Sequence, residues 1–175
     1  MAMMEESHDV VEPALEQQQL VHLDETKAQA FLGTSCSDDD HLEGWYLDTG
    51  TMNHMTGHGN VFSELDRAVQ GTVKFRDGSV VNICGKGTII FSERHGEHKA
   101  LTGVYWIPRL KNSIISIGQM DEGGARVLIE GGVLRVWDRR HRLLARVQRT
   151  ENRMYRLELQ VARPLYLVVH QDDDA

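Results

Sequence analysis

The chain has 175 residues, 41% of them apolar, with 16 Gly and only 3 Pro, a composition that suits one domain with additional tails. No run of eighteen apolar residues is present, so we expect no transmembrane helix, and the acidic N-terminus lacks the features of a signal peptide. Cys36 and Cys84 fit no zinc-binding spacing. We expect both to be free thiols in a reducing compartment, and the protein to be cytoplasmic.

The formal net charge of −7 is unevenly distributed, because residues 1–43 hold eleven acidic residues and one Lys. The rest of the chain is mildly basic. Residues 1–43 are therefore expected to be a disordered acidic tail and linker, at most weakly helical. The solvated stretch S-C-S-D-D-D-H places the domain boundary just before residue 44.

From Trp45 onward, apolar residues recur with a period of two, which is typical of β-strands. The predicted strands are 72–76, 79–84, 88–92, 99–107, 114–116, 125–130, 133–137, 143–147 and 154–159. Asp77-Gly78, Gly85–Gly87 and Gly131-Gly132 are predicted turns, and residues 117–122 are a predicted short helix ended by Gly123-Gly124. The pattern predicts an all-β fold with one short helix, a small closed β-barrel or closed sandwich over residues 44–130. Residues 131–175 are predicted to be a separate linker region with β-hairpins.

The stretch W-Y-L-D-T-G at Trp45–Gly50 carries an apolar strand directly into a carboxylate and a turn. A strand would hold Asp48 rigidly, and Gly50 would let the chain turn away. Asp48 either caps the next element or acts as one of two facing carboxylates that share a proton, as in aspartic proteases. No second Asp-Thr-Gly or Asp-Ser-Gly occurs in the chain. A dyad would therefore require a two-fold homodimer.

Several further motifs follow this stretch in order: F-x-x-L at 62–65, G-T-V-K-F-x-D-G-S at 71–79, G-K-G-T-I at 85–89, V-Y-W-I-P-R-L-K-N-S-I-I-S-I-G-Q at 104–119 and N-R-M-Y-R-L at 152–157. Together they closely resemble the protease region of plant copia-type LTR retrotransposon Gag-Pol polyproteins, over roughly residues 40–160. The resemblance implies a retropepsin-like aspartic endopeptidase that cleaves polyprotein peptide bonds.

The resemblance also implies a set of site residues. Asp48, Thr49 and Gly50 would form the catalytic loop, and no metal or organic cofactor would be required. A hairpin around Gly85, Lys86 and Gly87 would be the substrate flap, with Asp77-Gly78 as a competing flap tip. Residues beyond about 131 resemble the linker that leads toward integrase. Thr51 and Arg76 depart from the family pattern, in which a small residue and a Gly are usual, and either departure would weaken activity.

Three alternatives remain open. The chain could be an inactive β-barrel remnant that acts as a non-catalytic interaction module. His54 and His58 are four residues apart, but the loop has no evident third metal ligand, and His54 is expected to support the loop by hydrogen bonding. The arginines of residues 135–156 could mark a nucleic-acid-binding fragment, but they are expected to form a solvated strand face, because aromatic residues are few and the chain is acidic. We therefore expect a homodimer and a peptide substrate, but neither a nucleic-acid nor a membrane partner.

Overall fold

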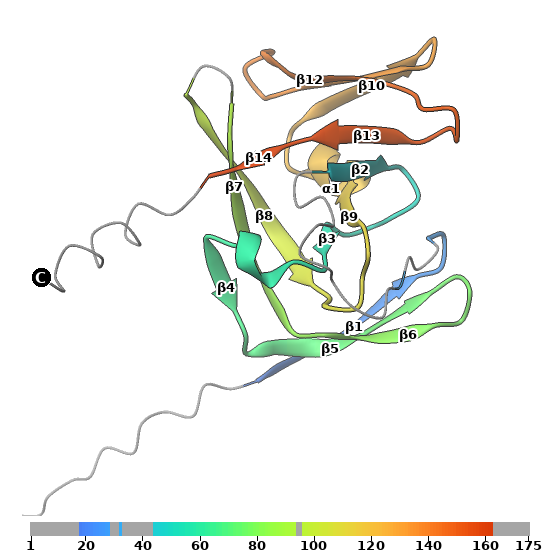
Figure 1. The fold of residues 1–175 in the computed structure, drawn as a ribbon, viewed down its shortest axis with the longest axis vertical. Helices are drawn as coiled ribbons and strands as arrows, with labels where there is room; N and C mark the ends of the chain where they lie inside the picture. Colours follow the sequence, from blue (N-terminus) through green and yellow to red (C-terminus); the bar gives the residue numbers. More distant parts are fainter. Residues whose placement is uncertain (1–17, 29–31, 33–43, 94–95, 163–175) are drawn as a thin grey trace, which may run out of the picture.

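The computed structural model describes residues 18–28, 32, 44–93 and 96–162 (Figure 1). This part is mostly β, as predicted, and contains one short α-helix. The elements in chain order are β1 (Gln19–Glu25), β2 (Gly44–Asp48), β3 (Met55–Thr56), the 3₁₀ turn η1 (Gly59–Val61), β4 (Glu64–Asp66), β5 (Val69–Phe75), β6 (Val80–Ile83), β7 (Gly85–Ser92), β8 (His98–Trp106), β9 (Ser113–Ser116), α1 (Ile117–Glu122), β10 (Arg126–Glu130), β11 (Val133–Trp137), β12 (Leu143–Gln148), β13 (Tyr155–Glu158) and β14 (Gln160–Val161).

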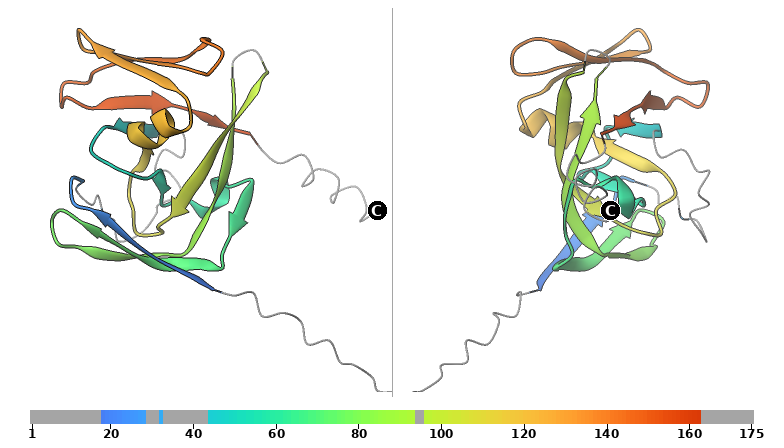
Figure 2. Two further views of the ribbon diagram at one scale, coloured as in Figure 1. Left: turned by 180° about the vertical axis from the view of Figure 1, so that it is seen from behind. Right: turned by 60° about the vertical axis from the view of Figure 1, so that its left-hand side comes forward.

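Three sheets make up the described part of the chain. The main sheet has the strand order β13-β2-β9-β3-β8-β7-β14, with β4 also paired to β7. The N-terminal sheet has the order β1-β5-β6, and the C-terminal sheet has the order β10-β11-β12. Figure 1 shows the N-terminal sheet at the bottom of the molecule and the C-terminal sheet at the top, and the rear view in Figure 2 agrees.

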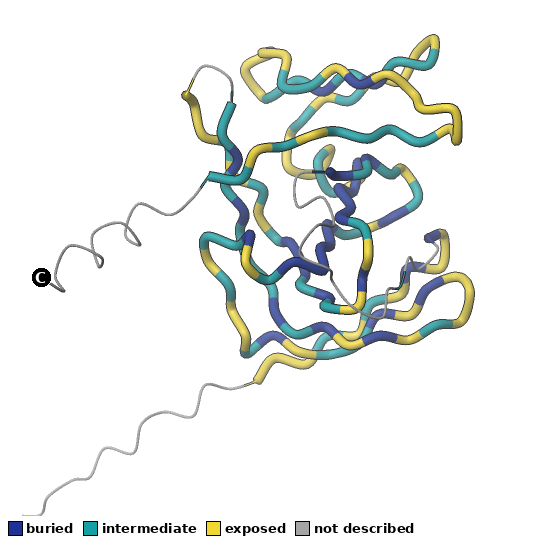
Figure 3. The backbone as a smooth tube through the Cα atoms, viewed as in Figure 1, coloured by how far each residue is buried: buried dark blue, intermediate teal, exposed yellow. Residues whose placement is uncertain are grey.

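Two apolar cores lie between these sheets. Neighbouring residues of a main-sheet strand face different cores, since side chains alternate along a strand. Ile114 packs in the core with Val73 and Phe75 of the N-terminal sheet, whereas Ile115 packs in the core with Leu134 of the C-terminal sheet. The buried segments in Figure 3 accordingly run through the middle of the molecule. The apolar run at Ile114-Ile115 is therefore buried on both faces.

The structure shows no closed barrel within the described residues. The two ends of the main sheet are instead occupied by β13, which pairs with β2, and by β14, which pairs with β7. Leu159 alone separates β13 from β14 in the chain. One nearly continuous segment therefore lies along both edges of the main sheet.

The N-terminal part of the chain differs from the prediction of a disordered tail. Residues Gln19–Glu25 form β1, which pairs in parallel with β5 from Gln19↔Val69 to Glu25↔Phe75. Val21 and Leu23 pack against the core of the N-terminal sheet. The predicted linker S-C-S-D-D-D-H and residues 1–17 lie outside the described residues.

The boundary predicted after residue 130 falls in the turn of a hairpin. β10 and β11 pair directly across Gly131-Gly132, where both glycines adopt positive φ angles. β13 and β14 belong to the main sheet. Residues 131–162 are thus built into the same architecture as residues 44–130, and residues 163–175 lie outside the described part.

The predicted turn at Gly85, Lys86 and Gly87 is wrong, because these residues form the start of β7 between β4 and β8. A Cβ atom on Gly87 would collide with the carbonyl oxygen of Glu64 in β4. The glycine is needed for close strand approach rather than for a mobile hairpin tip. The turn at Asp77-Gly78 does form, with Gly78 at a φ of 85°.

Within the described residues, no helix has the length and apolar character needed to cross a membrane. Cys84 is a half-buried free thiol, and Cys36 lies outside the described part.

Candidate active site

Asp48 lies at the C-terminal end of β2, between two neighbouring strands. β2 pairs in parallel with β9, with Asp48 opposite Ser116, and antiparallel with β13. Trp45 and Leu47 are buried and anchor the strand, while Asp48 is half-buried. Its carboxylate Oδ1 accepts a hydrogen bond of 2.7 Å from the backbone N–H of Gly50. The strand and this short turn fix the carboxylate, as predicted from the sequence.

Gly50 was expected to permit a sharp turn of the backbone, but in the structure it permits close packing. Its φ angle is not in the left-handed region. A Cβ atom at this position would lie 3.2 Å from Asp48 Oδ1 and 3.4 Å from the carbonyl oxygen of Lys27. The absence of a side chain thus leaves room for the carboxylate on one side and for the segment after β1 on the other. Thr49, which lies between Asp48 and Gly50 in the chain, is exposed to solvent.

His54 and Ser116 hold the far end of the loop by hydrogen bonding, as predicted for His54. The ring Nδ1 of His54 accepts the Ser116 backbone N–H at 2.9 Å. Ser116 Oγ donates to the carbonyl oxygen of Thr51 at 2.7 Å and caps α1 by accepting from Gln119 N–H. His54 is 3% exposed, and this burial lowers its pKa to about 4. The ring is therefore neutral near pH 7.

Gln119 ties the same loop to β8. Its Oε1 accepts the His54 backbone N–H at 2.9 Å, and its Nε2 donates to the carbonyl oxygens of Thr102 and Gly103. One side chain from α1 therefore bridges two segments far apart in the sequence. No local pattern in the sequence indicates this role.

Glu25 is a second carboxylate close to the Asp48 loop. Its side chain is fully buried, and its two oxygens accept hydrogen bonds of 2.8 Å from Met52 N–H and from Asn53 Nδ2. Burial raises the pKa of the Glu25 carboxyl, and the nearby Asp48 charge raises it further, while the bonds from Met52 and Asn53 oppose this shift. Because both oxygens already have partners in the loop, Glu25 positions the loop and is not presented to a substrate.

Thr51 is buried behind the loop at 2% exposure. Its hydroxyl oxygen has no hydrogen-bond partner within the described residues. A buried hydroxyl without a partner costs free energy. Thr51 at this position therefore has a stability cost in the structure.

A cavity of about 220 Å³ opens beside Asp48. The residues that line it come from β2 and the residue after it, from β9 and β10, from the turn before β13 and from the start of β13. Its lining comprises Tyr46, Leu47, Asp48, Thr49, Ile114, Ile129, Arg153, Met154 and Tyr155. The region predicted to be a linker thus contributes part of the wall around the candidate catalytic carboxylate.

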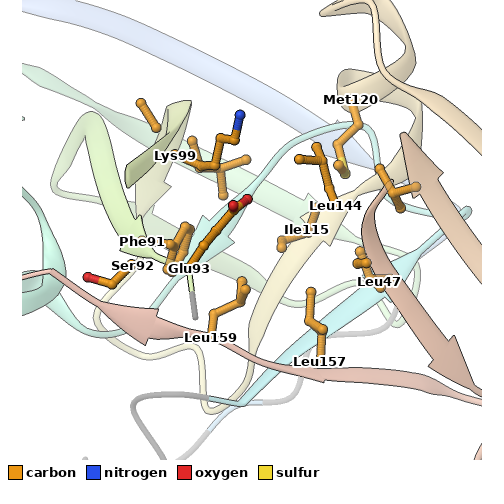
Figure 4. A pocket seen from close by; sticks show the side chains of 14 residues that line it. Leu47, Phe91, Ser92, Glu93, Lys99, Ile115, Met120, Leu144, Leu157 and Leu159 are labelled. Carbon is orange, nitrogen blue, oxygen red and sulfur yellow. The ribbon is translucent and has the colours of Figure 1, made fainter. Parts of the chain in front are cut away.

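A second, more apolar cavity of about 150 Å³ lies between the main sheet and the C-terminal sheet (Figure 4). Leu47, Ile115, Leu144 and Leu157 point into it in the figure. Lys99 at its rim forms an ion pair of 3.7 Å with Asp138. Its polar lining residues are Ser92, Glu93 and Lys99, whereas Asp48 borders the other cavity.

His54 and His58 do not form a metal site in the described part of the chain, where no group of three or more His, Cys, Asp or Glu side chains is arranged to hold an ion. The Nδ1 atom of His54 is already occupied by the Ser116 N–H.

The structure brings Asp48, Thr49 and Gly50 together in one loop but places Gly85, Lys86 and Gly87 elsewhere. The strand neighbours of Asp48 are β9 and β13, whereas those of Gly85–Gly87 are β4 and β8. Sequence reasoning missed Glu25 and Gln119. For Glu25 a signal was available, because Val21, Leu23 and Glu25 alternate inward along β1.

Residues 45–125 match a family model described as "Pol polyprotein, beta-barrel domain". The matched stretch runs from β2 to the residue before β10, so it includes Asp48, Thr49 and Gly50 and covers less than half of the chain. The match supports a region of a retroelement Pol polyprotein. No curated protein and no solved structure matches the chain.

Proposed function

We propose that this chain contains a retropepsin-like aspartic endopeptidase domain of a copia-type retrotransposon polyprotein, which becomes active when two copies pair their Asp48 carboxylates. The observation that carries the proposal is the Asp48 side chain, half-buried at the end of a rigid strand and bordering a cavity. The neighbouring carboxylate in the same chain, Glu25, is occupied by the loop. The second catalytic carboxylate would therefore come from a second copy.

Two such carboxylates would hydrolyse a peptide bond without a cofactor. Like charges close together do not both ionise, so one Asp48 would be protonated and the other ionised. The ionised group would take a proton from a water molecule, and the protonated group would donate to the scissile carbonyl oxygen. The two apparent pKa values would belong to the pair.

The β5–β6 hairpin is the remaining candidate for a substrate flap. Its tip, Asp77-Gly78, follows Arg76, whose backbone N–H donates to the carbonyl oxygen of Ala28 at 2.9 Å. The adjacent Lys27 carbonyl oxygen lies beside Gly50. The hairpin is thus linked through the end of β1 to the Asp48 loop, and an extended peptide would lie beneath it as an added strand.

A non-catalytic interaction module is the second candidate, and one observation favours it. Both edges of β2 are already paired, and Arg153, Met154 and Tyr155 line the cavity beside Asp48. This arrangement leaves less room for a second copy and a peptide. The buried, unpartnered hydroxyl of Thr51 is a further cost to the loop.

Peptide cleavage by the full chain, measured across about pH 4 to 7 with wild type and Asp48→Asn, distinguishes the two candidates. The oxygen of the introduced amide can still accept the Gly50 N–H, so the loop should persist while the carboxylate is lost. Asp121→Asn, which changes an exposed carboxylate on α1, is the matched control. Sedimentation would report the oligomeric state.

Cleavage by wild type and Asp121→Asn that disappears in Asp48→Asn would support the endopeptidase. Absence of cleavage by a folded wild-type dimer would refute it and favour the interaction module. Cleavage that persists in Asp48→Asn would also refute the assigned role of Asp48.

A further inference from the structure

The outward face of the C-terminal sheet carries a cluster of arginines around one tryptophan. Leu134 and Val136 of β11 are buried in the core, so the alternate residues Arg135 and Trp137 face outward. The pairing register places Arg126 of β10 opposite Trp137, and Arg146 of β12 opposite Arg135. Arg126, Arg135 and Arg146, which we call the arginine cluster, therefore share one face.

The arginine cluster is not neutralised within the described part of the chain. None of its three members forms an ion pair there. Asp138, which follows β11 directly, forms ion pairs with Lys99 and Arg142 instead. Glu130 is the one acidic residue on the same face, opposite Val133 at the end of the hairpin. Residues 126–149 hold seven Arg and two acidic residues.

Arg135 and Arg146 lie directly opposite each other on adjacent strands. Like charges in this position destabilise a sheet unless a counter-charge is present. A bound polyanion would supply that counter-charge along the whole cluster. The cluster is thus better explained by a ligand than by the internal stability of the sheet.

Trp137 narrows the class of polyanion. The Arg126 guanidinium lies 5.3 Å from the centre of the Trp137 ring. A planar guanidinium held on an aromatic ring is a surface on which an unpaired base can stack. Leu128 and Leu143, exposed by 37% and 53%, lie opposite Arg135 and Trp137. The face therefore combines cations with flat and apolar contacts, as single-stranded nucleic acid requires.

The acidic net charge of the chain does not oppose this surface. Residues 44–175 hold fifteen acidic and eighteen basic residues, so the part of the chain that carries this face is mildly basic. We propose that the outward face of β10-β11-β12 binds single-stranded nucleic acid through the arginine cluster and Trp137. This role is independent of Asp48 and of peptide cleavage, and it revises the expectation drawn from composition.

The experiment measures binding of the full chain to a fluorescent single strand of about 20 nucleotides, as RNA and as DNA, over a range of salt concentrations. The test variant carries Arg126→Gln, Arg135→Gln and Arg146→Gln. The control variant carries Lys74→Gln, Arg109→Gln and Lys111→Gln, which removes the same charge from exposed residues outside the C-terminal sheet. A third variant replaces the three arginines with Lys.

We expect the test variant to lose at least about tenfold in affinity and to show a log–log salt slope shallower by about 2, because each phosphate contact contributes about 0.7. The control and the Lys variant should keep most of that slope, and Trp137→Leu should weaken binding without changing the slope. Equal affinity for RNA and DNA would show that the face recognises phosphates and bases. Higher affinity for RNA would show that it also contacts the 2′-hydroxyl groups.

Equal losses in the test and control variants would overturn the proposal, as would failure of the wild type to bind. Equally tight binding to a duplex, to polyglutamate or to anionic lipid vesicles would show a general polyanion surface and overturn the assignment to single strands. Asp48→Asn should bind nucleic acid as wild type does. A failure of nucleic-acid binding is therefore distinguishable from a failure of the proposed endopeptidase activity.

Discussion

At the residue scale, the Asp48 loop is shaped by polar side chains that are buried with their partners. Glu25 accepts hydrogen bonds from Met52 and Asn53 of the loop, and Ser116 donates to Thr51 and His54 on either side of them. Such groups are costly to bury unless each hydrogen bond is made. The position of the Asp48 carboxylate therefore depends on residues that never contact a substrate.

His54 should make the fold sensitive to acid. Its pKa is about 4 in the folded chain and about 6.5 when unfolded, so the unfolded state binds a proton first as the pH falls. Stability should be retained above about pH 6.5 and should decline toward pH 4, by at most about 3 kcal/mol.

Urea unfolding at several pH values checks this prediction. His54→Asn, whose side-chain oxygen can accept the Ser116 N–H but does not titrate, should flatten the decline. The exposed His98→Asn is the control. If His54→Asn loses stability with the same dependence on pH as wild type, burial of His54 is not the cause.

The sequence was sufficient to predict the residues whose role is local. Asp48 lies at the end of a strand and His54 supports the loop by hydrogen bonding, as expected, while the catalytic role of Asp48, Thr49 and Gly50 stays a prediction. The hydrogen-bond partners of Glu25 and Gln119 could not be predicted in the same way, because they lie 27 and 65 residues away, at Met52 and His54. Hydrogen bonds of that sequence separation depend on strand pairing that no local pattern specifies.

At the scale of elements, prediction succeeded where a glycine pair marks the end of an element. β11 and α1 have the predicted bounds, because Gly131-Gly132 closes one hairpin and Gly123-Gly124 ends the helix. Gly85–Gly87 was misassigned because glycine marks both turns and close strand approach. The sequence does not distinguish these two uses without knowing where β4 lies.

Gly87→Ala should therefore reduce stability rather than alter a moving lid. The added methyl group would collide with the backbone of Glu64 and displace β4, and we expect a loss of about 2 kcal/mol or more. Gly118→Ala in α1 is the matched control, because its Cβ atom would lie 3.8 Å from Ser116 Oγ in ordinary contact and would favour the helix. Chemical unfolding of both variants checks the prediction, and a fully stable Gly87→Ala would contradict the β4–β7 packing.

At the scale of the whole molecule, the strand content was predictable but the sheet arrangement was not. Short strands with a period of two can pair in many orders, and the pairing of β1 with β5 joins segments 50 residues apart. The division of Ile114 and Ile115 between two cores also follows only from the three-sheet arrangement. The prediction of a mostly β chain with one short helix is confirmed, whereas the closed barrel is not found in the described residues.

Removal of β1 should destabilise the entire N-terminal sheet. Deleting residues 1–28 would expose the edge of β5, remove Val21 and Leu23 from the core and leave Met52 N–H without its Glu25 partner. We expect a loss of about 3 kcal/mol or more in the free energy of unfolding. Deletion of residues 1–17, which retains β1, is the control. Equal unfolding midpoints for the two deletions would show that β1 contributes little.

The segment from β13 to β14 has a consequence for how the molecule opens. Its two halves cover strands β2 and β7 at opposite ends of the main sheet, yet only Leu159 lies between them. Detaching one half would pull on the other, so the two ends of the sheet should fray as one cooperative unit. Their backbone amides should then exchange with deuterium at a common rate, and a single cut in the exposed turn at Thr150–Arg153 should leave that shared protection intact.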